Sequence, residues 1–172
     1  KIVAREKNPF IEYKLSHFNT KTIKRALSKN DILKIINADC TNQGKLRQLT
    51  HDLFSFSYLC GGISFVDIAN LTRQNIVEDR LIYQRQKTHG NINLLLSKEA
   101  STIIAKYSTY QQEAEYLFPI LHCKRHITPM QKSNRVHKIC HQVNTELRAF
   151  AKELGITAEV TTYTAKHHTI SI

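Results

Sequence analysis

Apolar residues recur at spacings of three and four over much of this chain, the pattern of helices that bury one face. One such stripe begins at Leu46 and ends before Gly61 and Gly62. A longer stripe fills residues 133–154 and is followed by Gly155, a residue suited to the left-handed position after a helix end. We therefore predict a helix over residues 46–59 and the longest helix of the chain over residues 133–154.

Shorter helices are indicated by their start signals. Ser28 precedes Asp31 by three residues and Ser64 precedes Asp67 in the same way, so each serine is predicted to cap a short helix. Ser97 is predicted to cap a further helix through about Tyr110. A last helix is expected to begin near Thr162.

One segment departs from the helical spacing of apolar residues. In "RLIYQRQKTHGNINLLL", residues 81–83 and 92–96 have strand composition and flank a polar, basic turn at residues 87–90. This pattern predicts a two-stranded hairpin with a basic tip. The fold class expected is α+β, mainly α-helical with a small antiparallel β-sheet.

The charge balance narrows the choice of partners. The 172 residues, 41% of them hydrophobic, suffice for one core, and 25 Lys and Arg against 14 acids give a net charge of +11. Such an excess favours a polyanion, with nucleic acid ahead of a membrane surface or a merely basic enzyme. No run reaches the ~18 apolar residues of a membrane span. We expect a cytoplasmic domain without membrane contact, and reduced thiols for its four dispersed cysteines.

A histidine and cysteine group offers an alternative chemistry. "HCKRH" holds His122, Cys123 and His126, and "VHKICHQ" holds His137, Cys140 and His141. A zinc site could be drawn from these spacings, but Cys140 lies on an apolar helical stripe and no tight cysteine pair recurs. The interpretation preferred is a core thiol with surface histidines on a basic face, with no metal and no cofactor.

Three dispersed motifs together resemble the tyrosine recombinase (phage integrase) family, most closely its branch in mobile elements of Bacteroides-like bacteria. The motifs are "GGISFVDIANL", "KTHG" at the hairpin tip, and the terminal "TTYTAKHH". They occur in the family's order from about Leu27 onward. The resemblance implies a catalytic-domain fold and DNA strand cleavage and rejoining through a phosphotyrosyl intermediate.

In that family a tyrosine attacks the scissile phosphate, cationic residues hold the phosphate oxygens, and a hairpin lysine protonates the leaving oxygen. The resemblance gives Lys87 the role of the hairpin lysine. Ser64 stands where the family has its first arginine and Lys166 where it has the second; Tyr163 replaces the box histidine, and His167 matches the histidine after the second arginine. Further phosphate contacts are expected from Arg85, His168 and Arg73.

The departures of this sequence from the family pattern are expected to affect activity. Lysine presents one compact charge where arginine presents a planar fork, so the exchange at position 166 weakens a bidentate clamp. Tyr163 lies on the wrong element for a nucleophile, which the resemblance places beyond Ile172. We expect residues 1–27 to be a basic lead-in from a missing N-terminal DNA-binding domain, and residues 28–172 to be a truncated, by itself inactive catalytic domain.

The expected partner is double-stranded DNA, with self-association into a synaptic tetramer in the intact protein. The alternative function is a basic helical DNA-binding module without strand transfer, either a decayed recombinase or an unrelated regulator.

Overall fold

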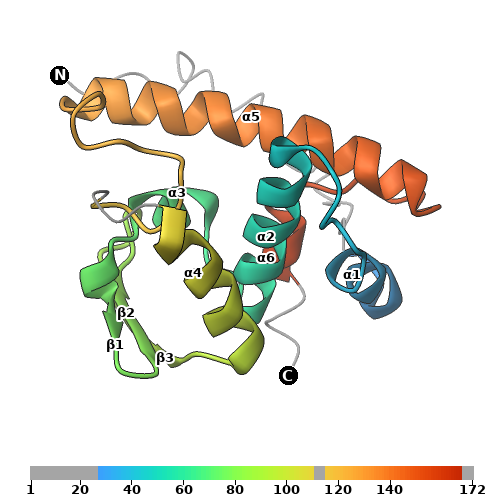
Figure 1. Cartoon of the computed structure of the whole chain (residues 1–172), viewed down its shortest axis with the longest axis horizontal. Coiled ribbons are helices and arrows are strands. Elements are labelled where there is room, and N and C mark those ends of the chain that lie inside the picture. The colour runs from blue at the N-terminus through green and yellow to red at the C-terminus, as the bar shows by residue number, and fades with distance from the viewer. Residues whose placement is uncertain (1–26, 111–114, 168–172) are drawn as a thin grey trace, which may run out of the picture.

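The computed structural model describes residues 27–110 and 115–167 (Figure 1). Elements follow one another in the order α1 (Lys29–Ile36), α2 (Lys45–Leu59), α3 (Phe65–Asn70), the 3-10 helix η3 (Arg73–Asn75), β1 (Ile76–Val77), β2 (Arg80–Gln84), β3 (Asn91–Leu95), α4 (Lys98–Tyr110), α5 (Pro129–Glu153) and α6 (Thr164–His167). The fold is therefore mainly helical with one small antiparallel sheet, which confirms the expected class.

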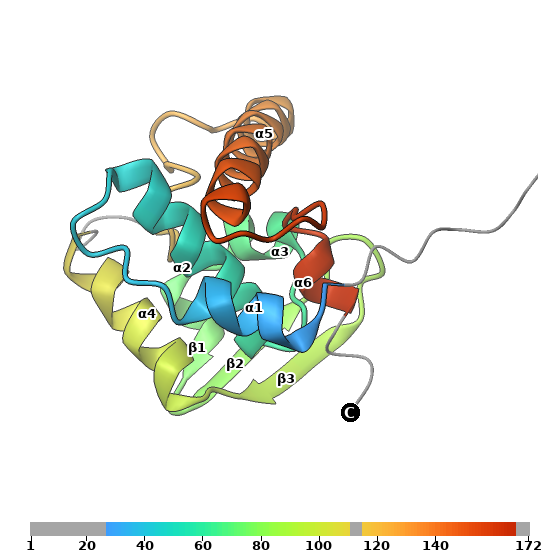
Figure 2. The ribbon, with the colours of Figure 1, turned by 90° about the vertical axis from the view of Figure 1, so that its right-hand side faces the viewer.

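Helix α2 lies at the centre of the molecule. It packs against α1, α3, α4, α5 and α6, and residues 52–57 are buried without interruption. Figures 1 and 2 show α5 crossing one end of the assembly, with α4 and the sheet on the opposite side of α2 from α1. The predicted one-sided stripe is wrong at its start, because Leu46 is 40% exposed. The rest of α2 is buried or half-buried, apart from Lys45.

The sheet has the order β1-β2-β3, and both pairs are antiparallel. Tyr83 pairs with Ile92 in the predicted hairpin, which is confirmed. Leu81 and Tyr83 are buried while Ile82 and Gln84 are exposed, so β2 alternates as a half-buried strand should. Strand β1 was not predicted, since two residues carry too little pattern.

The capping signals account for most helix starts. Ser28, Ser64 and Ser97 each accept a backbone N–H from three residues ahead, as expected. Helix α5 begins at Pro129 rather than near Ser133, because Thr128 and Gln131 form a capping box around it. Gly155 has φ +71°, which confirms its left-handed role.

Burial confirms most of the apolar stripe predicted over residues 133–154. Two residues of this stripe, Cys140 and Leu154, are half-buried. Its other members are buried: Val136, Ile139, Val143, Leu147, Phe150 and Ala151. Tyr107 and Tyr116 are buried as packing residues, whereas the side chain of Tyr110 lies outside the described part. The four cysteines are free. None of the helices in residues 27–110 and 115–167 has the length and apolar character needed to cross a bilayer.

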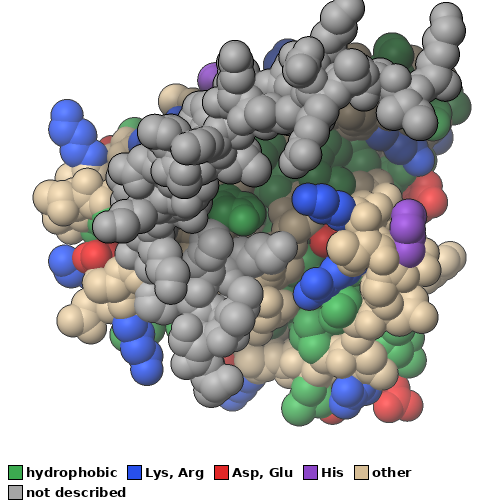
Figure 3. Space-filling model, turned by 180° about the vertical axis from the view of Figure 1, so that it is seen from behind, with side chains coloured by type: hydrophobic (Ala, Val, Ile, Leu, Met, Phe, Trp, Pro, Cys, Tyr) green, Lys and Arg blue, Asp and Glu red, His purple; other side chains and the backbone are tan. Residues whose placement is uncertain are grey.

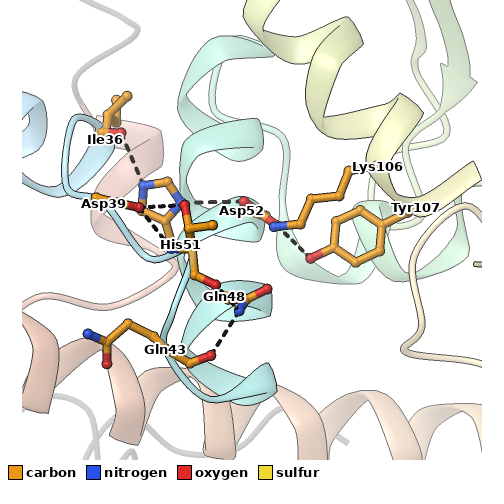
Figure 4. Close-up of polar contacts among 9 residues, drawn as sticks. Ile36, Asp39, Gln43, Gln48, His51, Asp52, Lys106 and Tyr107 are labelled. Carbon is orange, nitrogen blue, oxygen red and sulfur yellow. Dashed lines mark hydrogen bonds and ion pairs between the residues drawn. The ribbon is translucent and has the colours of Figure 1, made fainter.

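A buried carboxylate ties α2 to its neighbours (Figure 4). Asp52 Oδ2 accepts hydrogen bonds from Lys106 Nζ at 2.6 Å and from the Tyr107 hydroxyl at 2.7 Å, both on α4. Its Oδ1 lies 3.3 Å from His51 Nδ1, and His51 Nε2 lies 3.0 Å from the Ile36 carbonyl oxygen of α1. The network thus links three helices.

The same contacts fix the charge of Asp52. Burial by itself would raise the pKa of this carboxyl, but its three hydrogen bonds outweigh burial and hold the pKa below the ordinary value of 3.8. Burial and the charge of Asp52 raise the pKa of Tyr107, so its hydroxyl remains a donor. Asp52 therefore stays ionised in the folded protein.

We expect Asp52→Asn to lower the free energy of unfolding by about 2–3 kcal/mol at pH 7, because Lys106 loses its buried anionic partner. Urea denaturation measures this, with Asp79→Asn as an exposed control. A depressed folded pKa gives stability that is present above 3.8 and is lost as the pH falls through the folded value. The difference from the parent should therefore shrink below about pH 4; a constant difference would contradict the assignment.

Candidate functional site

Asp67 joins two of the three segments singled out in the sequence. The Ser64 hydroxyl donates to Asp67 Oδ2 at 2.7 Å, and the Asp67 N–H donates to Ser64 Oγ at 3.2 Å. Asp67 Oδ1 accepts the backbone N–H of Gln86 at 2.8 Å. The carboxylate is 7% exposed, so it acts as a structural link, which confirms the capping role expected for it.

The tip of the β2–β3 hairpin is a closed, basic turn. The Arg85 N–H donates to the Gly90 carbonyl at 2.9 Å, and the His89 N–H donates to the Arg85 carbonyl at 2.9 Å. His89 has φ 53°, a left-handed conformation that turns the chain back. Lys87 is exposed at this tip, one residue after Gln86. The link from Asp67 to Gln86 therefore fixes the base from which Lys87 projects.

Tyr83 lies on β2, two residues before Arg85. Burial, followed by the charge of Asp67, raises the pKa of its phenol, while a hydrogen bond from Arg85 opposes the shift. The phenol is thus kept neutral.

The third segment is held against α5. Asn144 Oδ1 accepts the Thr162 N–H at 2.8 Å, and Thr164 closes a local turn by bonding both the N–H and the carbonyl of Thr161. Tyr163 is 62% exposed. Lys166 and His167 belong to α6 by their backbone, whereas His168 lies outside the described residues.

A groove of about 520 Å³ lies between α3, the hairpin residue Gln86 and the first half of α5. Phe65, Val66 and Asn70 of α3 line one wall, Gln86 contributes from the hairpin, and the first half of α5 supplies Lys132, His137 and Cys140. Cys140 Sγ lies 3.8 Å from Thr162 Oγ1. The groove wall thus reaches the start of the third segment. Figure 3 shows Lys and Arg side chains beside apolar surface on the face opposite that of Figure 1.

Arg73 lies apart from this arrangement. It sits on η3, and its Nη2 donates to the Ser108 carbonyl at 2.6 Å near the end of α4. The structure therefore brings α3, Gln86 of the hairpin and α5 together at one groove, and it attaches Thr162 to Asn144 of α5. Ser64, Lys87 and Tyr163 are not among the residues that line this groove, and Arg73 is engaged elsewhere. Sequence reasoning missed the role of Gln86, which directly precedes the predicted basic turn, and the roles of Lys132 and Asn144, which belong to no local motif.

The histidine and cysteine group does not converge. Within residues 27–110 and 115–167, no three His, Cys, Asp or Glu side chains are grouped as metal ligands. His126 Nδ1 accepts the His122 N–H at 2.9 Å, and His122 Nδ1 accepts the Lys124 N–H at 3.1 Å. Burial and then Arg135 lower the pKa of His126, which suits an imidazole acting as an acceptor.

Comparison with solved structures places the fold in the class of tyrosine recombinase catalytic domains. The lambda integrase catalytic core matches with a TM-score of 0.54 and 16% identity, covering 84% of this chain and 80% of that one. XerA recombinase matches with a TM-score of 0.55 and 16% identity, covering 84% of this chain and 48% of that one.

A lambda integrase dimer bound to a COC′ core site matches with a TM-score of 0.55 and 16% identity, covering 84% of this chain and 39% of that one. This chain spans about half the length of XerA recombinase. No protein-family model and no curated protein matches the sequence. At this identity the likeness establishes the fold, and it confirms the expected catalytic-domain architecture.

Asp67→Ala is expected to free the hairpin tip, because the Gln86 N–H loses its acceptor and α3 loses a capping contact. We expect a loss of about 2 kcal/mol in the free energy of unfolding and faster hydrogen exchange at Gln86. Asp67→Asn keeps one acceptor oxygen and should lie between Ala and the parent. Unchanged exchange at Gln86 in Asp67→Ala would show that the link does not hold the tip.

Proposed function

We propose that this chain is the catalytic domain of a site-specific DNA recombinase or integrase, of the Bacteroides-type mobile-element branch. The observation that carries the proposal is a fold shared with lambda integrase and XerA recombinase, in which Asp67 ties α3 to the hairpin and Asn144 ties α5 to Thr162 beside one groove. The net charge of +11 supports a DNA substrate.

The reaction proposed is strand cleavage by a tyrosine hydroxyl, with the 5′ oxygen as leaving group and a phosphotyrosyl bond retained for rejoining. Lys87, exposed on a tip fixed at its base, donates the proton to the leaving oxygen. The segment 163–167, carrying Tyr163, Lys166 and His167, faces the phosphate oxygens. Ser64 supplies a neutral contact when its hydroxyl exchanges its hydrogen bond to Asp67 for one to the phosphate. Arg85 and His168 bind flanking phosphates.

This cation set is weaker than a pair of arginines would be. A planar guanidinium makes two parallel hydrogen bonds to one phosphate, whereas an ammonium makes one compact contact. We therefore infer that cleavage is slow. Other cations on the groove wall, such as Lys132, replace part of the missing charge at the phosphate. Self-association on DNA in the intact protein belongs to the same proposal.

The competing function is DNA binding without strand transfer. Incubation of the intact protein with supercoiled plasmid separates the two, because binding alone leaves the linking number unchanged. Nicked or relaxed product that carries covalently bound protein supports the recombinase. Stable binding with unchanged topology under the same conditions supports a decayed or purely binding module.

Binding of duplex DNA by this chain should be weak and steeply dependent on salt, because the affinity comes from phosphate contacts. Each phosphate neutralised adds about 0.9 to the slope of log K against log salt. Fluorescence anisotropy over about 50–200 mM salt measures the slope. A slope near zero would remove nucleic acid as the main partner.

Lys87→Arg and Lys166→Arg should act in opposite directions in the intact protein. Arginine at 87 keeps the charge but not a readily transferred proton, so DNA binding persists while cleavage slows roughly a hundredfold. Arginine at 166 restores a two-pronged phosphate contact, so cleavage is preserved or raised by as much as ~1–2 kcal/mol of transition-state stabilisation.

A suicide substrate that traps the covalent protein–DNA complex measures both variants. Lys98→Arg, an exposed lysine at the start of α4, is the matched control. If Lys166→Arg lost cleavage while Lys87→Arg behaved as the parent, the two roles would be wrong.

A further inference from the structure

The start of the segment 163–167 depends on one side chain of another helix. Asn144, half-buried on α5, accepts the Thr162 N–H on Oδ1 at 2.8 Å. Its Nδ2 donates to Cys140 Sγ at 3.6 Å, and that sulfur lies 3.8 Å from Thr162 Oγ1. The amide thus holds Thr162 directly and again through Cys140, across 18 residues of sequence.

Helix α6, which follows Thr162, has its own anchor in the core. Thr164 and Ala165 are 2% and 0% exposed, and α6 packs on α2. A helix of four residues has too few internal hydrogen bonds to hold its own direction, so both anchors are needed to orient it. Asn144 is itself well placed for this task, because its neighbours Val143 and Leu147 on α5 are fully buried.

The residue type at 144 also suits an anionic ligand. The sequence contains no Asp or Glu between Glu115 and Glu146, so the groove wall formed by α5 carries only neutral and basic side chains. An aspartate at 144 would offer the same acceptor to Thr162 but would add a negative charge next to Tyr163. Asparagine supplies both the acceptor and the donor without that charge.

We propose that Asn144 is a positioning residue: it sets the direction of residues 163–167 toward the scissile phosphate. The proposal rests on the recombinase function above. Two properties of the Asn144 side chain matter, its hydrogen bond to Thr162 and its lack of charge. Each of them is tested by a different measurement.

The test compares Asn144→Ala, Asn144→Asp and the control Asn134→Ala, an exposed asparagine on the same helix. Hydrogen exchange of residues 162–167 and thermal unfolding are measured on this chain. Covalent-complex formation at saturating suicide substrate, and DNA affinity at about 50 and 200 mM salt, are measured on the intact protein.

In Asn144→Ala we expect faster exchange at Thr162 and about tenfold slower covalent-complex formation, with DNA affinity within about twofold of the parent. Asn144→Asp should keep the exchange protection and form the complex within about threefold of the parent rate. It should bind DNA more weakly at low salt, with the difference closing at high salt. Asn134→Ala should match the parent.

Unchanged exchange at Thr162 in Asn144→Ala, or an unchanged rate of covalent-complex formation, would overturn the proposal. A loss of rate accompanied by global unfolding would also overturn it, because a merely structural role would then suffice. If the parent forms no covalent complex, the recombinase function fails and the catalytic part of this proposal fails with it. The exchange data then decide separately whether Asn144 orders the segment.

Discussion

The fold depends on the burial of the middle of α2. A helix with six consecutive buried residues, from Asp52 to Ser57, must be covered on every side, and five other helices provide the cover. Its buried polar atoms must then find partners inside the protein. Asp52 does so through Lys106, Tyr107 and His51. The hydroxyls of Thr50 and Ser55 have no hydrogen-bond partner among the described residues, a cost that apolar packing around α2 outweighs.

The candidate site inherits its geometry from this central helix. Gly61 and Gly62, both with positive φ, let the chain leave α2 and enter α3 at once, which places Ser64 and Asp67 beside the core. Helix α6 packs on the same α2 from another direction. Apolar packing therefore brings the segments close, and single polar links, Asp67 to Gln86 and Asn144 to Thr162, set their final orientation.

Local features could be predicted from the sequence because their causes are local. Ser28, Ser64 and Ser97 cap helices through atoms three residues away, and the hairpin follows from strand residues flanking a polar turn. The true start of α5 also has a local signal, which is Thr128 with Pro129 and Gln131. The prediction followed the apolar stripe instead, and that stripe begins later. Asn144 could not be found in this way, since its partner is 18 residues away on a different helix.

The contrast between fold and site explains how this architecture persists at 16% identity to lambda integrase. The apolar part of the packing around α2 requires residues of suitable volume, and many sequences satisfy that requirement. An anion clamp is more demanding, because the number and direction of its hydrogen bonds depend on the residue type. Under the function proposed above, serine at 64 and lysine at 166 supply fewer hydrogen bonds to phosphate than two arginines would. The fold alone therefore does not fix the strength of the proposed phosphate contact, which depends on the residue types at the site.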